Sequence, residues 1–142
     1  MDHLRKLLAE REMFSVEKTE TVAAVTRKMA QRNIGAILVL ENGDLRGVFS
    51  KRDLMKRVVV ENRDPATTTV EQVMTTDLAV IAEDASVAEA MELMSERGIR
   101  HLPVVRGRQA LGMVSMRDLM DIELDSRTQE LEHMRSYIHG PV

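Results

Sequence analysis

The feature that most constrains this chain is an internal repeat. The segment GVFSKRDLM at 47–55 returns as GMVSMRDLM at 112–120, after a shift of 65 residues. The same shift aligns Val22 with Val87, and no gap is needed anywhere between 15 and 58. A register held over that length indicates a duplication, so we expect two copies of one supersecondary unit.

Each copy predicts a strand, a helix, a two-stranded hairpin and a second helix, from its hydrophobic spacing and its Gly-containing turn. A single copy would leave one apolar sheet face uncovered, so we expect the two copies to pack sheet to sheet as one α/β unit. Thr21 and Ser86 are expected to cap the first helices, and Asn33 and Gly98 to end them in the left-handed conformation. The expected elements are strands at 14–18 and 78–82, helices at 22–32 and 87–97, hairpins at 36–50 and 101–115, and helices after Ser50 and Ser115.

The polar stretch 61–69 contains the first proline and is the expected linker. We therefore expect repeat 1 at 8–60, repeat 2 at 70–122 and a C-terminal helical extension at 123–142. The last helix is predicted to end near residue 138 and carries an apolar stripe at helical spacing. Packing on the chain's own core and contact in a homodimer are both compatible with this stripe. Its members are Met120, Leu124, Leu131, Met134 and Ile138.

Composition excludes several classes of protein. A net charge of −3 and an aromatic content of 2% argue against binding nucleic acid through phosphates or stacked bases. The chain has no cysteine, which excludes disulfides and thiolate metal sites. No apolar run approaches the roughly 18 residues of a membrane span, and residues 1–14 predict an amphipathic helix capped by Asp2 rather than a secretory signal. We expect a cytoplasmic protein without nucleic-acid or membrane partners.

The sequence also predicts neither a catalytic site nor a metal site. No Gly-rich phosphate loop and no Gly-x-Ser-x-Gly elbow occur. No histidine pairs with another histidine or a carboxylate at the spacing of a metal site. A hydrolase is disfavoured because no metal-binding carboxylate cluster is visible. The four histidines are His3, His101, His133 and His139.

The polar chemistry is concentrated in a motif that occurs twice, Gly-φ-φ-Ser-x-Arg-Asp, where φ is apolar. Each copy ends a strand and begins a helix, whose free N–H groups attract phosphate. The serine adds a hydrogen bond, the arginine a positive charge, and the aspartate an acceptor for both hydroxyls of a ribose. Ser-x-x-Asp is also the pattern of a capping box, and composition and spacing leave both interpretations open. The motif residues are Ser50, Arg52 and Asp53, and Ser115, Arg117 and Asp118.

The run from Ile99 through His101, Pro103 and Val105, followed by a turn and the motif at 112–118, resembles a CBS (cystathionine-β-synthase) repeat. Two in tandem resemble a CBS pair, or Bateman module, over residues 8 to 122, similar to stand-alone bacterial CBS-pair proteins. The resemblance implies an α/β fold of two β-α-β-β-α repeats with pseudo-two-fold symmetry, followed by the long C-terminal helix. It also implies a homodimer with a regulatory rather than catalytic role.

The resemblance further implies that AMP, ADP, ATP, S-adenosylmethionine or NADH binds in two clefts between the repeats. The ribose would lie on Asp53 and Asp118, beside Ser50 and Ser115. An unidentified effector protein would read the bound state. The alternative is a dimerisation module whose clefts stay empty.

Some family members place a basic pair just before Leu-Pro against the phosphate. Arg100 and His101 occupy that position, next to Pro103, whereas the equivalent Gly35 and Ala36 carry no charge. We therefore expect the two clefts to differ, and the cleft with Arg100 and His101 to be the phosphate site.

Overall fold

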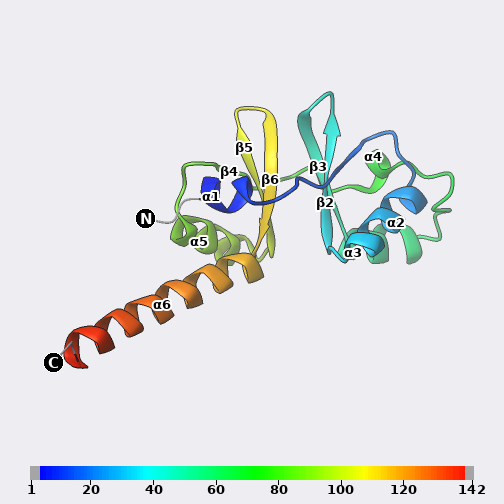
Figure 1. Ribbon diagram of the computed structural model, residues 1–142. Coiled ribbons are helices and arrows are strands. Elements are labelled where there is room, and N and C mark those ends of the chain that lie inside the picture. The colour runs from blue at the N-terminus through cyan, green and yellow to red at the C-terminus, as the bar shows by residue number, and fades with distance from the viewer. Residues whose placement is uncertain (1–3, 140–142) are drawn as a thin grey trace.

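The computed structural model describes residues 4–139, which form two similar halves with a long helix projecting from one of them (Figure 1). The predicted element order is confirmed in both halves, although the strand expected at 78–82 is only two residues long. The first half contains β1 (Ser15–Glu17), α2 (Val22–Arg32), β2 (Ala36–Glu41), β3 (Asp44–Ser50), α3 (Lys51–Asp53) and the π-helical segment η1 (Leu54–Val59). The second contains β4 (Ile81–Ala82), α5 (Val87–Arg97), β5 (His101–Arg106), β6 (Gln109–Ser115) and α6 (Met116–His139). Two short helices, α1 (Leu4–Ala9) and α4 (Val70–Val73), precede β1 and β4.

The strand register reveals the pseudo-two-fold axis. The strands follow the order β1-β2-β3-β6-β5-β4, and Ala36 opposite Ser50 in one hairpin matches His101 opposite Ser115 in the other. The halves join where Asp44 of β3 lies opposite Gln109 of β6, and these two residues are 65 positions apart. A two-fold axis exchanges equivalent residues, so a pair of equivalents facing each other lies beside that axis. The predicted pseudo-symmetry is confirmed.

Both faces of β2 are buried, which explains its continuous apolar run. Successive strand residues point to opposite faces, and a strand covered on both sides needs no polar alternation. Ile37 and Val39 pack with α2 in the core of the first half, whereas Leu38 and Leu40 face the second half. The expected packing of sheet on sheet is present in a cluster of Ala36, Leu38, Leu40, Val48 and Ala110, with Leu45, Leu78 and Met113 against it.

The helix ends form as their sequences predict. Thr21 accepts a hydrogen bond from Ala24 N at 3.2 Å, and Ser86 forms a capping box with Glu89. Asn33 and Gly98 end α2 and α5 with φ of 53° and 63°, in the left-handed region that favours Asn and Gly.

The helix α1 packs on the second half, although the chain then continues into the first (Figure 1). Leu4 is fully buried, and its N–H donates to Ala85 O at 3.3 Å. A Cβ on Gly112 would lie 2.6 Å from Leu8 Cδ2, so a larger residue at 112 would require the Leu8 side chain to shift. The predicted N-terminal helix is confirmed, whereas Asp2 lies outside the described residues.

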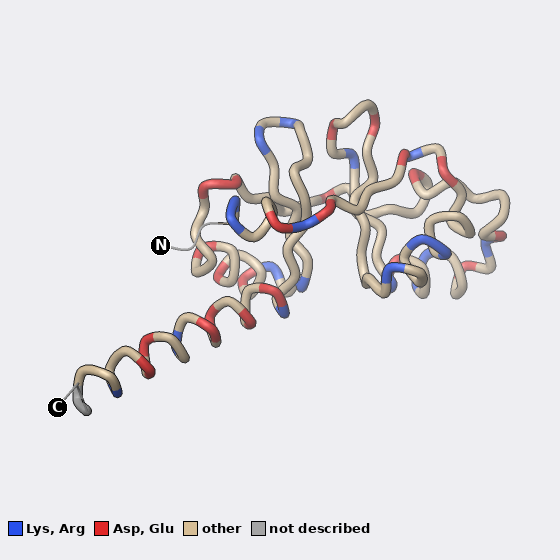
Figure 2. Tube along the Cα trace, in the orientation of Figure 1, with Lys and Arg blue, Asp and Glu red and all other residues tan. Residues whose placement is uncertain are grey.

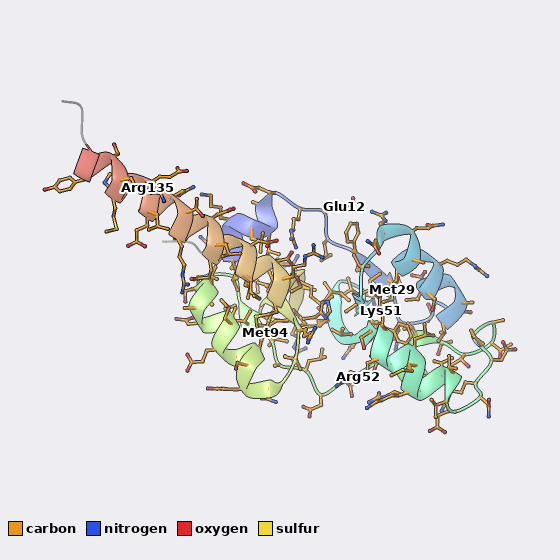
Figure 3. The ribbon with its side chains drawn as sticks, turned by 90° about the horizontal axis from the view of Figure 1, so that it is seen from below. Glu12, Met29, Lys51, Arg52, Met94 and Arg135 are labelled. Atoms are coloured by element: carbon orange, nitrogen blue, oxygen red, sulfur yellow. The ribbon has the colours of Figure 1, made fainter. Side chains whose placement is uncertain are left out.

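The helix α6 leaves the body after its first turns, and Figure 3 shows Arg135 far from both sheets. Its apolar stripe is not packed on the chain's own core, because Leu124, Leu131 and Met134 are 60%, 55% and 52% exposed. The own-core interpretation is therefore wrong for these residues, while the side chain of Ile138 is not described. Acidic and basic residues both occur along the helix (Figure 2). Within residues 4–139, α6 included, no helix has the length and hydropathy to cross a bilayer.

Candidate functional site

Two clefts lie between the halves, and each contains one copy of the Ser-x-Arg-Asp motif. The larger, of about 1110 Å³, is lined by Ser115, Arg117 and Asp118, and we name it the Asp118 cleft. The smaller, of about 510 Å³, is lined by Ser50, Arg52, Asp53 and Pro103, and we name it the Asp53 cleft. Arg100 and His101 complete the nine predicted site residues, all of which line a cleft.

Arg100 and His101 line both clefts, so the expectation that they belong to one of them is wrong. The physical reason is their place at the start of β5, where the two halves meet. A Cβ on Gly35 would lie 3.6 Å from the His101 ring and 3.8 Å from Lys51 Cε. Gly35 and His101 therefore form a wall that the two clefts share.

Both Ser-Asp pairs cap the helices that follow them. In the first, Ser50 N donates to Asp53 Oδ2 at 2.9 Å and Asp53 N donates to Ser50 Oγ at 3.2 Å. In the second, Ser115 N donates to Asp118 Oδ2 at 2.9 Å and Asp118 N to Ser115 Oγ at 3.1 Å. The capping interpretation is confirmed. Because these caps use only Oδ2 of each carboxylate, Oδ1 is left for another partner.

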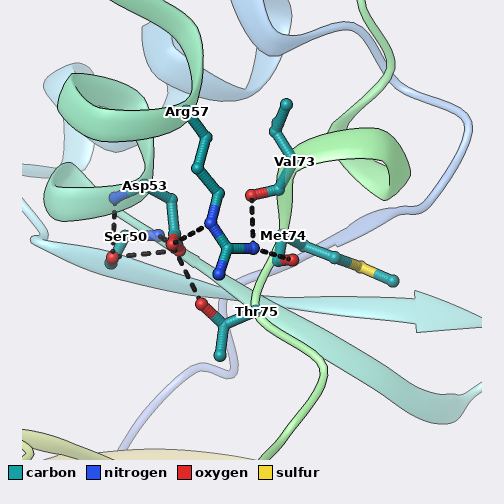
Figure 4. A network of polar contacts seen from close by, with 6 residues as sticks. All are labelled: Ser50, Asp53, Arg57, Val73, Met74 and Thr75. Carbon is teal, nitrogen blue, oxygen red and sulfur yellow. Dashed lines mark hydrogen bonds and ion pairs between the residues drawn. The ribbon is translucent and has the colours of Figure 1, made fainter. Parts of the chain in front are cut away.

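The second oxygen of Asp53 takes part in a network inside the first half (Figure 4). Thr75 Oγ1 donates to Asp53 Oδ1 at 2.9 Å, and Arg57 Nε lies 3.7 Å from the same oxygen. Arg57 also donates to the carbonyl of Met74 at 2.8 Å. Asp53 is only 5% exposed. The network joins α3 to the chain after α4.

The carboxylate of Asp118 instead meets an arginine from the segment between α1 and β1. Arg11 Nη1 donates to Asp118 Oδ2 at 2.9 Å, and Arg11 Nη2 binds Oδ1. Burial raises the pKa of Asp118, but the Arg11 guanidinium and the Ser115 donors outweigh it and hold the pKa below its ordinary value. Asp118 is therefore an ionised acceptor at neutral pH.

His101 is a half-buried imidazole between the clefts. Burial lowers its pKa, and the positive charges of Lys51 and Arg100 lower it further, against the opposing charge of Asp118. At neutral pH the ring is therefore uncharged, with one nitrogen able to donate and the other to accept a hydrogen bond.

Positive charge is available at both cleft rims. Arg52, Arg100 and Arg117 are exposed, and within residues 4–139 none of them has a carboxylate within ion-pair distance. In Figure 3, Lys51 and Arg52 lie together on the first half. Arginines that are not neutralised by the protein are suited to an anionic ligand.

A metal centre has no basis in the described part of the chain, where no group of three or more His, Asp or Glu side chains could hold an ion. The carboxylates Glu12, Asp77 and Asp121 also line the clefts, but they are dispersed.

Comparison with known proteins identifies the fold. The model of the CBS domain family matches residues 5–60 and 70–125. The mitochondrial CBS domain-containing protein CBSX3 of Arabidopsis thaliana is 32% identical over 126 residues, which cover 85% of this chain but only 61% of the plant protein. CBS domain-containing protein YhcV of Bacillus subtilis is 35% identical over 74% of either chain. A CBS-domain structure from Burkholderia ambifaria has a TM-score of 0.80 at 30% identity, covering 87% of this chain and 95% of its own. The chain therefore belongs to the CBS-domain family, as a tandem CBS pair.

Proposed function

We propose that this CBS pair binds an adenine nucleotide between its repeats and acts as a regulatory sensor without catalysing a reaction. The observation that carries the proposal is the Asp118 cleft, in which an ionised carboxylate lies with the unpaired arginines Arg100 and Arg117 in about 1110 Å³. A nucleotide site needs two kinds of polar group. One is a carboxylate that accepts hydrogen bonds from the ribose hydroxyls, and the other is a set of arginines that bind the phosphate. Small-molecule sites combine a few such groups with apolar walls.

The apolar wall for the adenine is provided by residues from both repeats. Ile34 follows α2 and Ile99 follows α5, and both line the Asp118 cleft together with Met113. The CBS domain pair of protein MJ0100, which has a TM-score of 0.78 to this chain at 20% identity, was solved with 5′-methylthioadenosine and S-adenosyl-L-methionine. The fold therefore accommodates adenosyl ligands. AMP, ADP or ATP fits the unpaired arginines best, with NADH and S-adenosylmethionine as further members of the class.

Regulation would act through the angle between the repeats. A ligand shifts a conformational equilibrium only if it binds one arrangement more tightly than the other. Among the described residues, the strands of the two halves pair only where Asp44 lies opposite Gln109, and both clefts lie between these halves. An effector protein or a second copy of the chain would detect the change.

The exposed stripe on α6 supports a homodimer as the second part of the proposal. Its residues Leu124, Leu131 and Met134 are more than half exposed, and a dimer would cover them. A related fold occurs in the hexameric CBS-CP12 protein from cyanobacteria, with a TM-score of 0.71 at 21% identity.

The test is a thermal-shift titration of the protein with AMP, ADP, ATP, S-adenosylmethionine and NADH. A ligand that binds only the native state adds about 2.7 kcal/mol at 100 times its Kd, a shift of several degrees. We expect stabilisation by an adenine nucleotide, loss of that shift in Asp118→Asn, and retention in Asp125→Asn, an exposed α6 carboxylate outside the clefts. Absence of a shift with every ligand would favour the alternative, a dimerisation module with empty clefts.

A further inference from the structure

The segment between α1 and β1 passes between the two halves and brings Arg11 to the Asp118 cleft (Figures 1 and 3). Its guanidinium binds both oxygens of the carboxylate, with Nη1 2.9 Å from Oδ2 and Nη2 on Oδ1. The two side chains are 38% and 20% exposed, so the pair lies at the accessible surface of the cleft. Arg11 therefore occupies the Asp118 carboxylate, which is the group that would accept hydrogen bonds from a ribose.

A ligand whose hydroxyls reach Asp118 has to displace this guanidinium. Oδ2 already accepts the capping hydrogen bond from Ser115 N, so little acceptor capacity remains while Arg11 is in place. The displaced arginine loses a bidentate ion pair. A neutral nucleoside provides no anionic group to replace the carboxylate. Two phosphate oxygens, in contrast, can accept hydrogen bonds from the same planar guanidinium.

We propose that Arg11 determines the charge selectivity of the Asp118 cleft, by disfavouring neutral adenosine and favouring phosphorylated adenine ligands. This inference rests on the proposed nucleotide binding and adds a residue that sets the ligand class. Selectivity is a difference between two affinities. Arg11 lowers the affinity for adenosine by competing with the ribose for Asp118. It raises the affinity for phosphorylated ligands by binding the phosphate once the guanidinium has been released from Asp118.

At the Asp53 cleft the arginine beside the carboxylate is placed differently. Arg57 Nε lies 3.7 Å from Asp53 Oδ1, but Arg57 also donates to the carbonyl of Met74 and is not among the residues that line this cleft. The chain before β4 passes that cleft as the chain before β1 passes the other, and Thr75 donates its hydroxyl to Asp53 Oδ1 at 2.9 Å. A threonine hydroxyl is neutral, so its displacement leaves no unpaired charge. Charge selectivity through an arginine that lines the cleft and pairs with its carboxylate is therefore expected at the Asp118 cleft.

The experiment measures Kd for adenosine and AMP by calorimetry on the full chain, before and after Arg11→Met. Asp118→Asn identifies which binding isotherm belongs to the Asp118 cleft. We expect adenosine to bind about 3-fold tighter and AMP about 10-fold weaker, so that the preference for AMP falls by about 30-fold. Arg5→Met is the matched control, because Arg5 contacts Glu83 outside the clefts at 3.7 Å. Arg11→Lys keeps the charge without the planar fork and should restore part of the preference.

Equal changes in the Kd for adenosine and for AMP, in either direction, would overturn the inference. Arg11 would then either block the cleft for both ligands alike or act only as a structural contact. If neither Kd changes in Arg11→Met, the inference is also overturned, while the proposed nucleotide binding remains intact. If neither ligand binds the wild-type protein or Arg11→Met, the proposed function itself fails, and the selectivity role with it.

Discussion

The two Ser-x-x-Asp motifs have the same local geometry and different surroundings. Asp53 is 5% exposed and is held by Arg57 from the same repeat and by Thr75 from the chain before β4. Asp118 lies in the larger cleft and is paired with Arg11, which lies 107 residues away in the chain. The comparison teaches that duplication preserves the cap, which is local, while the free carboxylate oxygen acquires a structural role in one copy and an accessible one in the other.

The largest expected effect is a difference in stability between the two aspartate variants. Asp53→Ala removes a cap and leaves Thr75 and Arg57 without their buried partner, so we expect a loss of about 3 kcal/mol in the free energy of unfolding. Asp118→Ala removes a cap and a partly exposed ion pair, for a loss of about 1 kcal/mol. Urea denaturation measures both losses. Equal losses would contradict the distinction between a structural and an accessible carboxylate.

A second variant isolates the network in the first half. Thr75→Val keeps the shape of the side chain and removes the donor to Asp53, which should cost about 1 kcal/mol. Thr76→Val, at the next and more exposed position, is the matched control and should leave the free energy of unfolding nearly unchanged.

The second helices of the repeats differ as well, and this difference predicts the site of dimerisation. η1 ends at Val59, whereas α6 continues to His139 with its apolar stripe exposed. Leu124→Glu with Leu131→Glu should weaken the proposed dimer at least about 10-fold, because charges would be buried in its interface. Analytical ultracentrifugation measures the dimer Kd, and Ser126→Glu with Gln129→Glu adds the same charge outside the stripe. Equal effects of the two double variants would exclude the stripe as the interface.

The smallest expected effect is the pH dependence that the Arg11 contact confers on Asp118. Because the pKa of Asp118 is lowered on folding from the model-peptide value of 3.8, its contribution to stability is present above that value. It is lost as the pH falls through the lower pKa of the folded state. The difference in the free energy of unfolding between wild type and Asp118→Asn should therefore shrink below about pH 4, and Arg11→Met should reduce that dependence. A difference that stays constant from pH 7 to pH 3 would contradict the pairing.

The sequence predicts the features of this fold that depend on nearby residues. Thr21, Ser86, Asn33 and Gly98 act as helix signals within one turn, so the helix ends follow from spacing alone. The shift of 65 residues also predicts the pseudo-symmetry, because equivalent segments fold alike.

Contacts between distant segments were not predictable in the same way. That Arg11 reaches Asp118 depends on α1 crossing to the second half, which no local pattern encodes. That Arg100 and His101 line both clefts depends on how the halves meet at Gly35. Hydrophobic periodicity identifies which face of an element is buried, but not which partner covers it.

The crossing of α1 also has a consequence for biosynthesis. A chain is made from its N-terminus, so Leu4 and Leu8 emerge long before their respective neighbours in the folded protein, Ala85 and Gly112. The first helix can reach its final place only after the second repeat has been translated. Such contacts of high sequence separation form late in folding, and a nascent chain arrested after the linker would hold Leu4 without the surface that buries it.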